Sequence, residues 1–321
     1  MENPIPPLLL QKACFTPPTR TPWGGHRIRR LKGLPSGDVV GESWELSIEP
    51  SFPSRLDDGR ALRDVLGDTP LLVKLLDAAD ALSVQIHPSD DDAGLAPDEA
   101  GKPEAWYVID RDPGAGIYLG LAEDADEATL RRVLAEGGDL SALLPFVPVE
   151  PGDFFSIEAG TPHCIGGGVF LVEPQRVSPG RRGVTYRYWD WNRTYDAEGR
   201  RDPGGSPRDL HVEEALAVTR WDLPRGERLL DQIRVRAGAP ALDDAARWDE
   251  LVEGPPLGVR RLAGTGELEL EVGPTVAGLT VLAGAITLGD LRVEAGRTAA
   301  LPPGHRGPAR LDRAHGIFST A

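Results

Sequence analysis

Residues 149–160 read VEPGDFFSIEAG, and residues 293–304 read VEAGRTAALPPG. The two stretches match at a constant offset of 144 residues, in the pairs Val149 and Val293, Glu150 and Glu294, Gly152 and Gly296, Ile157 and Leu301, and Gly160 and Gly304. Each copy has a glycine turn, a short strand and a second glycine turn, which indicates that one β-structure occurs twice. V-E-x-G alone is a match that chance can produce, but the shared offset at five positions favours duplication.

The two copies differ at a position that matters for chemistry. The first copy continues to His163, whereas the same offset in the second copy leads to Gly307, and the nearby His305 falls opposite Thr161. The repeat therefore predicts a first unit that can carry a metal ligand at this turn and a related second unit that has lost it. We expect the first unit over residues 1–220 and the second over residues 221–321.

The remaining pattern is mainly β. With 38 glycines and 30 prolines in 321 residues, frequent turns favour many short strands over long helices. Strands are predicted at 39–49, 71–88, 104–110 and 146–173, and nearly everything after about residue 230 reads as strand and turn. Helical spacing is confined to 61–66, 210–221 and a short segment at about 123–144, which Gly137 and Gly138 interrupt. Residues 194–209 are predicted to form a polar loop.

Composition limits the partners and the compartment. The formal net charge of −15 excludes the basic footprint of a nucleic-acid-binding protein. No apolar run approaches membrane-spanning length, and the N-terminal stretch lacks the basic residues of a signal peptide. The two cysteines, Cys14 and Cys164, cannot form a disulfide framework, so we expect a cytoplasmic protein. Nothing in the sequence indicates the oligomeric state.

A candidate metal site begins in the segment 81–88, ALSVQIHP. Side chains of a strand alternate between two faces, so one face carries Leu82, Val84 and Ile86, and the other carries Ser83, Gln85 and His87. A buried polar row is costly unless a partner satisfies it. Glu104 at the start of a strand and His163 after a turn supply a carboxylate and a second imidazole. Gln85, His87, Glu104 and His163 together suit zinc, with water or substrate completing the shell.

Each of these residues also has an ordinary structural explanation. Gln85 and His87 can form a hydrogen-bonded pair, Glu104 can be a solvated strand start, and His163 can cap a turn. For each residue taken singly, the structural explanation is the better one. The combination of the four in a duplicated β-structure favours the metal site. Cys164 should point away from His163 and belong to the core.

A basic segment can reverse the acidic field locally. Residues 173–193, EPQRVSPGRRGVTYRYWDWNR, contain the arginines Arg176, Arg181, Arg182, Arg187 and Arg193 but only two acids, Glu173 and Asp190. Arginine binds phosphate with paired donors, and the interleaved aromatic residues are typical of a pocket wall that contacts sugar. The alternatives are a cationic loop over acidic surface and an RNA-binding segment, and the net charge disfavours the latter. The segment therefore predicts a small phosphorylated ligand.

The motifs resemble the type I mannose-6-phosphate isomerase family in its shorter bacterial form. The resemblance covers roughly residues 20–195 and is carried by W-G-G (23–25), G-E-S-W-E-L-S (41–47), L-L-V-K-L-L-D-A (71–78), L-S-V-Q-I-H-P (82–88), G-K-P-E-A-W-Y (101–107), A-G-T-P-H (159–163) and V-T-Y-R-Y-W-D-W-N-R (184–193). It implies two cupin (jelly-roll) β-barrels, of which only the first binds metal. It also implies one zinc ion held by the same four residues.

The resemblance further implies residues that act on the sugar phosphate. Lys102 matches the lysine of K-P-E, while Arg181 matches the R-x-G-x-T of longer members and Arg187 the T-Y-R of shorter ones. Substrate contacts are expected from Trp23, Ser83, Glu173, Arg182 and Asp190. The Ser-Asp that many members carry before T-Y-R is absent here, so Lys102, Glu173 and Asp190 are all candidates for the proton-transfer group. The large helical insertion of longer members is absent as well.

The expected activity is the interconversion of mannose 6-phosphate and fructose 6-phosphate through an enediol. Two other functions fit a cupin fold. One is a different metal-dependent enzyme, such as an iron dioxygenase, against which Gln85 as a ligand argues. The other is a non-catalytic sugar-phosphate sensor, against which the full set of presumed ligands and Lys102 argues, although fold alone does not prove activity.

Overall fold

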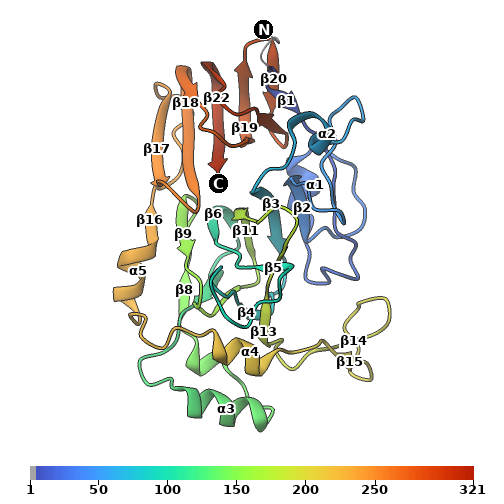
Figure 1. Cartoon of the computed structure of the whole chain (residues 1–321), viewed down its shortest axis with the longest axis vertical. Coiled ribbons are helices and arrows are strands. Elements are labelled where there is room, and N and C mark those ends of the chain that lie inside the picture. Colours follow the sequence, from blue (N-terminus) through green and yellow to red (C-terminus); the bar gives the residue numbers. More distant parts are fainter. Residues whose placement is uncertain (1–4) are drawn as a thin grey trace.

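The computed structural model describes residues 5–321 and is mainly β, as predicted (Figure 1). Its helices are short: α1 (Arg27–Leu31), α2 (Leu62–Leu66), α3 (Glu127–Ala135), η1 (Ser141–Leu143), α4 (Val212–Ala217) and α5 (Glu227–Ile233). The predicted segment at 123–144 is confirmed as α3 followed by η1. Asp126 caps α3 by accepting a hydrogen bond from the Thr129 backbone N–H at 2.8 Å, and Gly137 follows its end with φ +65°.

The strands form three main sheets. A six-stranded sheet has the order β16 (Arg234–Arg236), β9 (Asp153–Ile157), β6 (Glu104–Arg111), β11 (Val169–Arg176), β3 (Leu71–Ala78) and β2 (Glu42–Leu46). A five-stranded sheet has the order β13 (Tyr186–Trp189), β4 (Val84–Ile86), β10 (His163–Ile165), β7 (Gly116–Leu119) and β8 (Phe146–Pro148). The 194–209 region is mostly loop, with β14 (Thr194–Tyr195) and β15 (Ser206–Pro207) forming a hairpin that extends from the body (Figure 1).

The third sheet contains most of the C-terminal strands. Its order is β1 (Leu8–Leu9), β21 (Thr298–Leu301), β19 (Ala277–Leu288), β22 (Arg306–Thr320), β18 (Gly258–Glu271) and β17 (Arg247–Val252), and β20 (Leu291–Glu294) pairs with β19. A separate two-stranded pair joins β5 (Glu99–Ala100) to β12 (Arg182–Gly183). N-terminal β1 thus lies in the C-terminal sheet, and β16 lies in the six-stranded one. The two-barrel arrangement and the division at residue 220 stay predictions.

The repeated sequences adopt the same local structure. At the shared offset, β9 corresponds to β21, and both strands lie between turns that contain a glycine with positive φ. The φ values are +91° at Gly152 and +78° at Gly296, then +77° at Gly160 and +71° at Gly304. Glycine reaches this region without steric cost, which explains why both copies carry glycine at these two turns.

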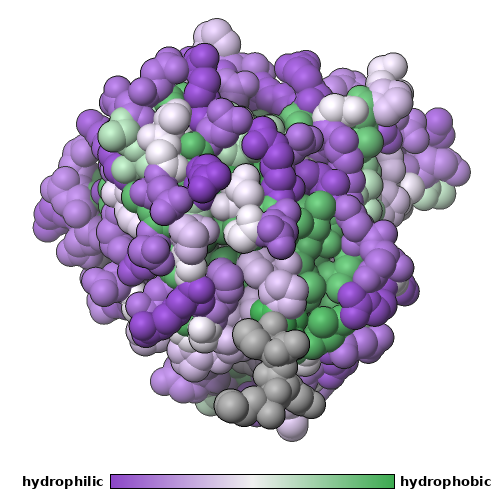
Figure 2. Space-filling model, turned by 90° about the horizontal axis from the view of Figure 1, so that it is seen from above, coloured by the Kyte–Doolittle hydropathy of each residue, from purple (hydrophilic) through white to green (hydrophobic). Residues whose placement is uncertain are grey.

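The surface agrees with the charged composition. Seen from above, the molecule is largely hydrophilic, with a hydrophobic area on one side (Figure 2). Across residues 5–321, no helix has the length and apolarity needed to cross a membrane.

A buried ion pair connects the N-terminal part of the chain to the C-terminal sheet. The Nζ of Lys32, which is 1% exposed, lies 2.8 Å from the Glu45 carboxylate and donates to the Gly296 carbonyl at 3.0 Å. Thr298 on β21 donates to the same carboxylate at 3.0 Å. Because β2 carries Glu45, the network joins the six-stranded sheet to β21.

We expect Lys32→Ala to lower the free energy of unfolding by about 3–5 kcal/mol, because it leaves Glu45 as an uncompensated buried charge. Urea denaturation followed by circular dichroism measures the change. Lys12→Ala is the control, since Lys12 is only half-buried, and its effect should stay within about 0.5 kcal/mol. Equal effects of the two substitutions would show that the ion pair does not stabilise the fold.

Candidate metal centre

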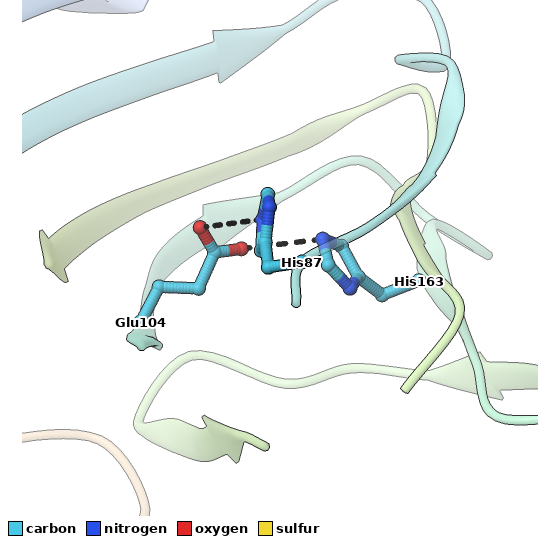
Figure 3. Close-up of side chains that lie close together, drawn as sticks. All are labelled: His87, Glu104 and His163. Atoms are coloured by element: carbon cyan, nitrogen blue, oxygen red, sulfur yellow. Dashed lines mark ion pairs between the residues drawn. The ribbon is translucent and has the colours of Figure 1, made fainter. Parts of the chain in front are cut away.

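Three predicted ligands come from two different sheets. His163 begins β10 and His87 directly follows β4, both in the five-stranded sheet, whereas Glu104 begins β6 in the six-stranded sheet. Their ligand atoms nevertheless all lie within 4.8 Å of one another. The two sheets therefore face each other at this point, and the side chains point toward a common centre (Figure 3).

The carboxylate of Glu104 lies between the two imidazoles. Its Oε2 is 3.1 Å from His87 Nε2, and its Oε1 is 3.3 Å from His163 Nε2 (Figure 3). All three side chains are buried, at 2–3% exposure. The ring centroids of the two histidines are 4.8 Å apart, and the Trp106 ring packs edge-on against His163 at 5.4 Å.

The free ring nitrogens suit a cation. His87 Nδ1 pairs with the Val184 carbonyl at 2.9 Å, and His163 Nδ1 pairs with the Thr161 carbonyl at 2.8 Å. Because a carbonyl only accepts, each Nδ1 carries the proton and each Nε2 presents a lone pair toward Glu104. Both Nε2 atoms are buried without a hydrogen-bond donor. Two lone pairs and a carboxylate facing one point fit a divalent metal ion.

The protonation states favour metal binding at neutral pH. Burial lowers the pKa of His163 to about 4, and burial with the nearby Lys102 cation lowers the pKa of His87. Burial alone would raise the pKa of Glu104, but the nearby Lys102 cation holds it well below its usual value. The group therefore contains two neutral imidazoles and one carboxylate, the forms in which these side chains coordinate metal.

The fourth predicted ligand, Gln85, lies beside the group. On β4 its Cα pairs with His163 of β10 on one side and with Arg187 of β13 on the other. Directly paired residues of antiparallel strands point to the same face, so the Gln85 side chain is directed as His163 is. Gln85 as a metal ligand stays a prediction.

Lys102 lies at the edge of the metal group. Its Nζ is 3.3 Å from Glu104 Oε2, and its side chain is 14% exposed. It lines a cavity of about 310 Å³, whose wall also includes Arg20, Trp44, Lys74, Gln175 and Arg182. This cavity therefore reaches a direct neighbour of Glu104. Another cavity, of about 760 Å³, is lined by Ile5, Pro6, Pro7, Val65, Leu66 and residues 302–306, none of which is a predicted site residue.

The predicted arginines occupy different surroundings. Arg187 donates from Nε to Ser83 Oγ at 3.0 Å and from Nη1 to the Asp209 carbonyl at 2.7 Å. Arg182 is 67% exposed and forms an ion pair with Glu99, and Arg181 is exposed beside it. Only Arg187 is thus connected to the polar row of β4.

Two of the predicted substrate contacts are buried, and their role stays a prediction. Trp23 is 5% exposed and belongs to a hydrophobic cluster with Leu76 and Ala78. Asp190 is 4% exposed and forms an ion pair with Arg193. Cys164 is fully buried in the same cluster as Trp23, as predicted.

Glu173 lies behind the metal group and is enclosed. Trp106 Nε1 donates to it at 3.2 Å, Gln175 Nε2 donates at 2.7 Å, and Lys74 Nζ lies 3.4 Å away. Burial and the neighbouring Glu104 charge raise the pKa of Glu173 to about 7. Sequence reasoning missed Gln175 and Lys74. Strand alternation offered a signal for Gln175, since it puts residues 173 and 175 on one face.

Comparisons with known proteins point to one family of enzymes. No protein-family model matches the chain. A mannose-6-phosphate isomerase of Streptococcus mutans is 37% identical over 214 residues, which cover 61% of this chain and 63% of that protein. A Bacillus subtilis protein named putative mannose-6-phosphate isomerase YvyI is 33% identical over 229 residues, which cover 65% of this chain and 67% of that protein. The alignment thus spans a little under two thirds of the Streptococcus relative.

A solved structure matches over the whole fold. The crystal structure of the mannose 6-phosphate isomerase from Bacillus subtilis is 25% identical to this chain, with a TM-score of 0.77. The superposition covers 99% of this chain and 100% of that one. The similarity agrees with the mainly β, cupin-type fold predicted from the sequence.

We expect the purified protein to bind one divalent metal ion per chain. His163→Ala should lower the metal affinity at least about 100-fold, because loss of a residue that merely hydrogen-bonds to a metal ligand already lowers the affinity about 10–100-fold. Metal analysis and competition with a chromophoric chelator measure the affinity. His305→Ala makes the same change in the C-terminal repeat and should bind metal normally. Wild-type affinity in His163→Ala would exclude this residue as a ligand.

Proposed function

Because this chain belongs to the mannose-6-phosphate isomerase family, we propose that it is a metal-dependent aldose–ketose isomerase that interconverts mannose 6-phosphate and fructose 6-phosphate. The observation that carries the proposal is the buried group of His87, Glu104 and His163, in which both Nε2 atoms lack a hydrogen-bond donor. Such a group has no structural need for its two free lone pairs, but it is suited to hold a metal ion beside a polar cavity.

Zinc is the proposed metal, with one ion per chain. Two imidazoles and a carboxylate are typical ligands of catalytic zinc, and the amide oxygen of Gln85 is the proposed fourth ligand, with water or substrate completing the shell. The bound ion would stabilise negative charge that develops on the substrate oxygens during proton transfer.

Lys102 is the proposed proton-transfer group. The reaction removes a proton from C2 of mannose 6-phosphate and returns one to C1, so the group must lie beside the metal ligands and reach the sugar. Lys102 lies 3.3 Å from Glu104 and on the wall of the 310 Å³ cavity. The other two candidates are less suitable, because Glu173 is enclosed by three donors and Asp190 is tied to Arg193.

Arg187 and Ser83 are proposed to hold the phosphate group. They are hydrogen-bonded to each other. Ser83 belongs to the row that also contains Gln85, and Arg187 pairs with Gln85 from β13, so a sugar held at the metal group can extend toward them. The partners of the Arg187 guanidinium within residues 5–321 are a hydroxyl and a carbonyl rather than a carboxylate. Its positive charge therefore remains available for an anion. Arg182, in contrast, is compensated by Glu99.

The expected partner is a small sugar phosphate rather than a nucleic acid, in agreement with the net charge of −15. A cytoplasmic location is also proposed, and the presence of Cys14 and Cys164 as free cysteines supports it.

We expect a coupled assay to detect turnover of mannose 6-phosphate that a chelator abolishes and zinc restores. Gln85→Ala and His163→Ala should each lower kcat/KM by at least about 100-fold, because both remove a proposed ligand of the metal. His305→Ala serves as the control and should retain activity. Absence of turnover in folded, zinc-loaded wild-type protein would contradict the isomerase and favour a sensor that binds sugar phosphates.

We expect Arg187→Met to raise the KM for mannose 6-phosphate about 10–100-fold, since a hydrogen bond to a charged group contributes about 1.5–3 kcal/mol. Steady-state kinetics with Arg181→Met and Arg182→Met in parallel identify the phosphate ligand, and Arg236→Met on β16 is the control. A larger increase in the Arg181 or Arg182 variant would assign the phosphate to that arginine instead.

A further inference from the structure

Gln175 lies next to the metal group, although it is not one of the four proposed ligands. On β11 its Cα pairs with Glu104 of β6 on one side and with Leu72 of β3 on the other. Paired residues point to the same face, so the Gln175 side chain lies over Glu104. It is 1% exposed, and its conformation is therefore set by protein contacts rather than by water.

The amide of Gln175 binds two carboxylates at once. Its Nε2 donates to Glu104 Oε2 at 2.9 Å and to Glu173 Oε2 at 2.7 Å. The ionised carboxylate of Glu104 can only accept, so the amide nitrogen must be the atom that faces it, and the same nitrogen carries the second hydrogen toward Glu173. Each hydrogen has its own acceptor, and the orientation of the amide is fixed.

Glu173 anchors this arrangement from behind. Trp106 Nε1 donates to Glu173 at 3.2 Å, and Lys74 Nζ lies 3.4 Å from it and 4.8 Å from the Trp44 ring centroid. Trp106 also packs edge-on against the ring of His163. The contacts therefore run from Lys74 through Glu173 and Gln175 to Glu104, with Trp106 joining Glu173 to a second member of the metal group.

We propose that Gln175 is a positioning residue for the metal site, which holds the carboxylate of Glu104 in the orientation that binds the ion. A hydrogen-bond donor to a coordinating carboxylate restricts the rotation of that carboxylate before the metal binds. Less conformational freedom is then lost when the metal binds. Gln175 also separates two carboxylates that would otherwise repel each other in a buried setting. The role of Gln175 rests on the metal site of the proposed function, but it does not depend on which sugar phosphate is the substrate.

A neutral donor is essential for this role. In Gln175→Met the side chain keeps nearly the same length but loses both hydrogen bonds. In Gln175→Glu a third carboxylate would face Glu104 and Glu173. The zinc affinity of this variant should therefore fall further than that of the methionine variant. The matched control is Gln232→Met, because Gln232 lies exposed on α5, outside the metal group.

The test measures zinc affinity by chelator competition and records the visible absorption spectrum of the cobalt-substituted protein. We expect Gln175→Met to raise the Kd for zinc about 10–100-fold and to change the cobalt spectrum at saturation, while Gln232→Met matches the wild type. A merely structural role would lower thermal stability without altering the spectrum of the bound metal. Wild-type Kd and spectrum in Gln175→Met would overturn the proposal.

If the variants fail to fold, NMR spectroscopy of the wild-type protein tests the role of Gln175. The chain has four glutamines, Gln11, Gln85, Gln175 and Gln232, so selective ¹⁵N labelling gives four side-chain amide pairs. The Gln175 pair should exchange slowly with solvent and shift when zinc is added. Fast exchange, or no shift on saturation with zinc, would overturn the role of Gln175.

The results also separate this proposal from the proposed function. A wild-type protein that binds no zinc contradicts both. A wild type that binds zinc and isomerises mannose 6-phosphate, combined with normal zinc binding in Gln175→Met, contradicts the positioning role alone. Zinc binding that depends on Gln175 without turnover supports the positioning role and contradicts the isomerase.

Discussion

The buried negative charge of Glu104 is the constraint on which the polar interior depends. A carboxylate at 3% exposure loses most of its hydration, and only close opposite charges and donors can compensate for that loss. Lys102 lies 3.3 Å away and Gln175 donates at 2.9 Å, yet the two neighbouring imidazoles present lone pairs rather than protons. The compensation is thus incomplete on the side of the histidines, which is the side where a cation fits.

The position of this charge depends on strand register. Glu104 pairs with Gln175 of β11 and with Ile157 of β9, and Gln85 pairs with His163 and Arg187. A shift of one residue in any of these pairs would turn the side chains to the opposite face and disperse the group. Turns with glycine at positive φ, such as Gly160 before His163, fix where the strands start.

The two copies of the repeat show how the same local structure can carry different chemistry. β9 and β21 share their flanking turns, but Gly307 occupies the position that corresponds to His163. The C-terminal sheet supplies no member of the metal group found among residues 5–321 and instead contacts the N-terminal part through Gly296 and Thr298. Backbone turns and apolar strands therefore persist where the ligand has been lost, because they depend on glycine and hydrophobicity rather than on the metal.

The sequence by itself determined the β class, most element positions and the candidate ligands, because side-chain alternation, turns and motif spacing are local properties. It missed α1 and α5. Only the tertiary structure showed that Glu104 meets His87 and His163 across two sheets, that Trp23 lies in the core, and that Gln175 bridges two carboxylates. These relations depend on which strands pair and which faces oppose, and long-range pairing leaves no local signal in the chain.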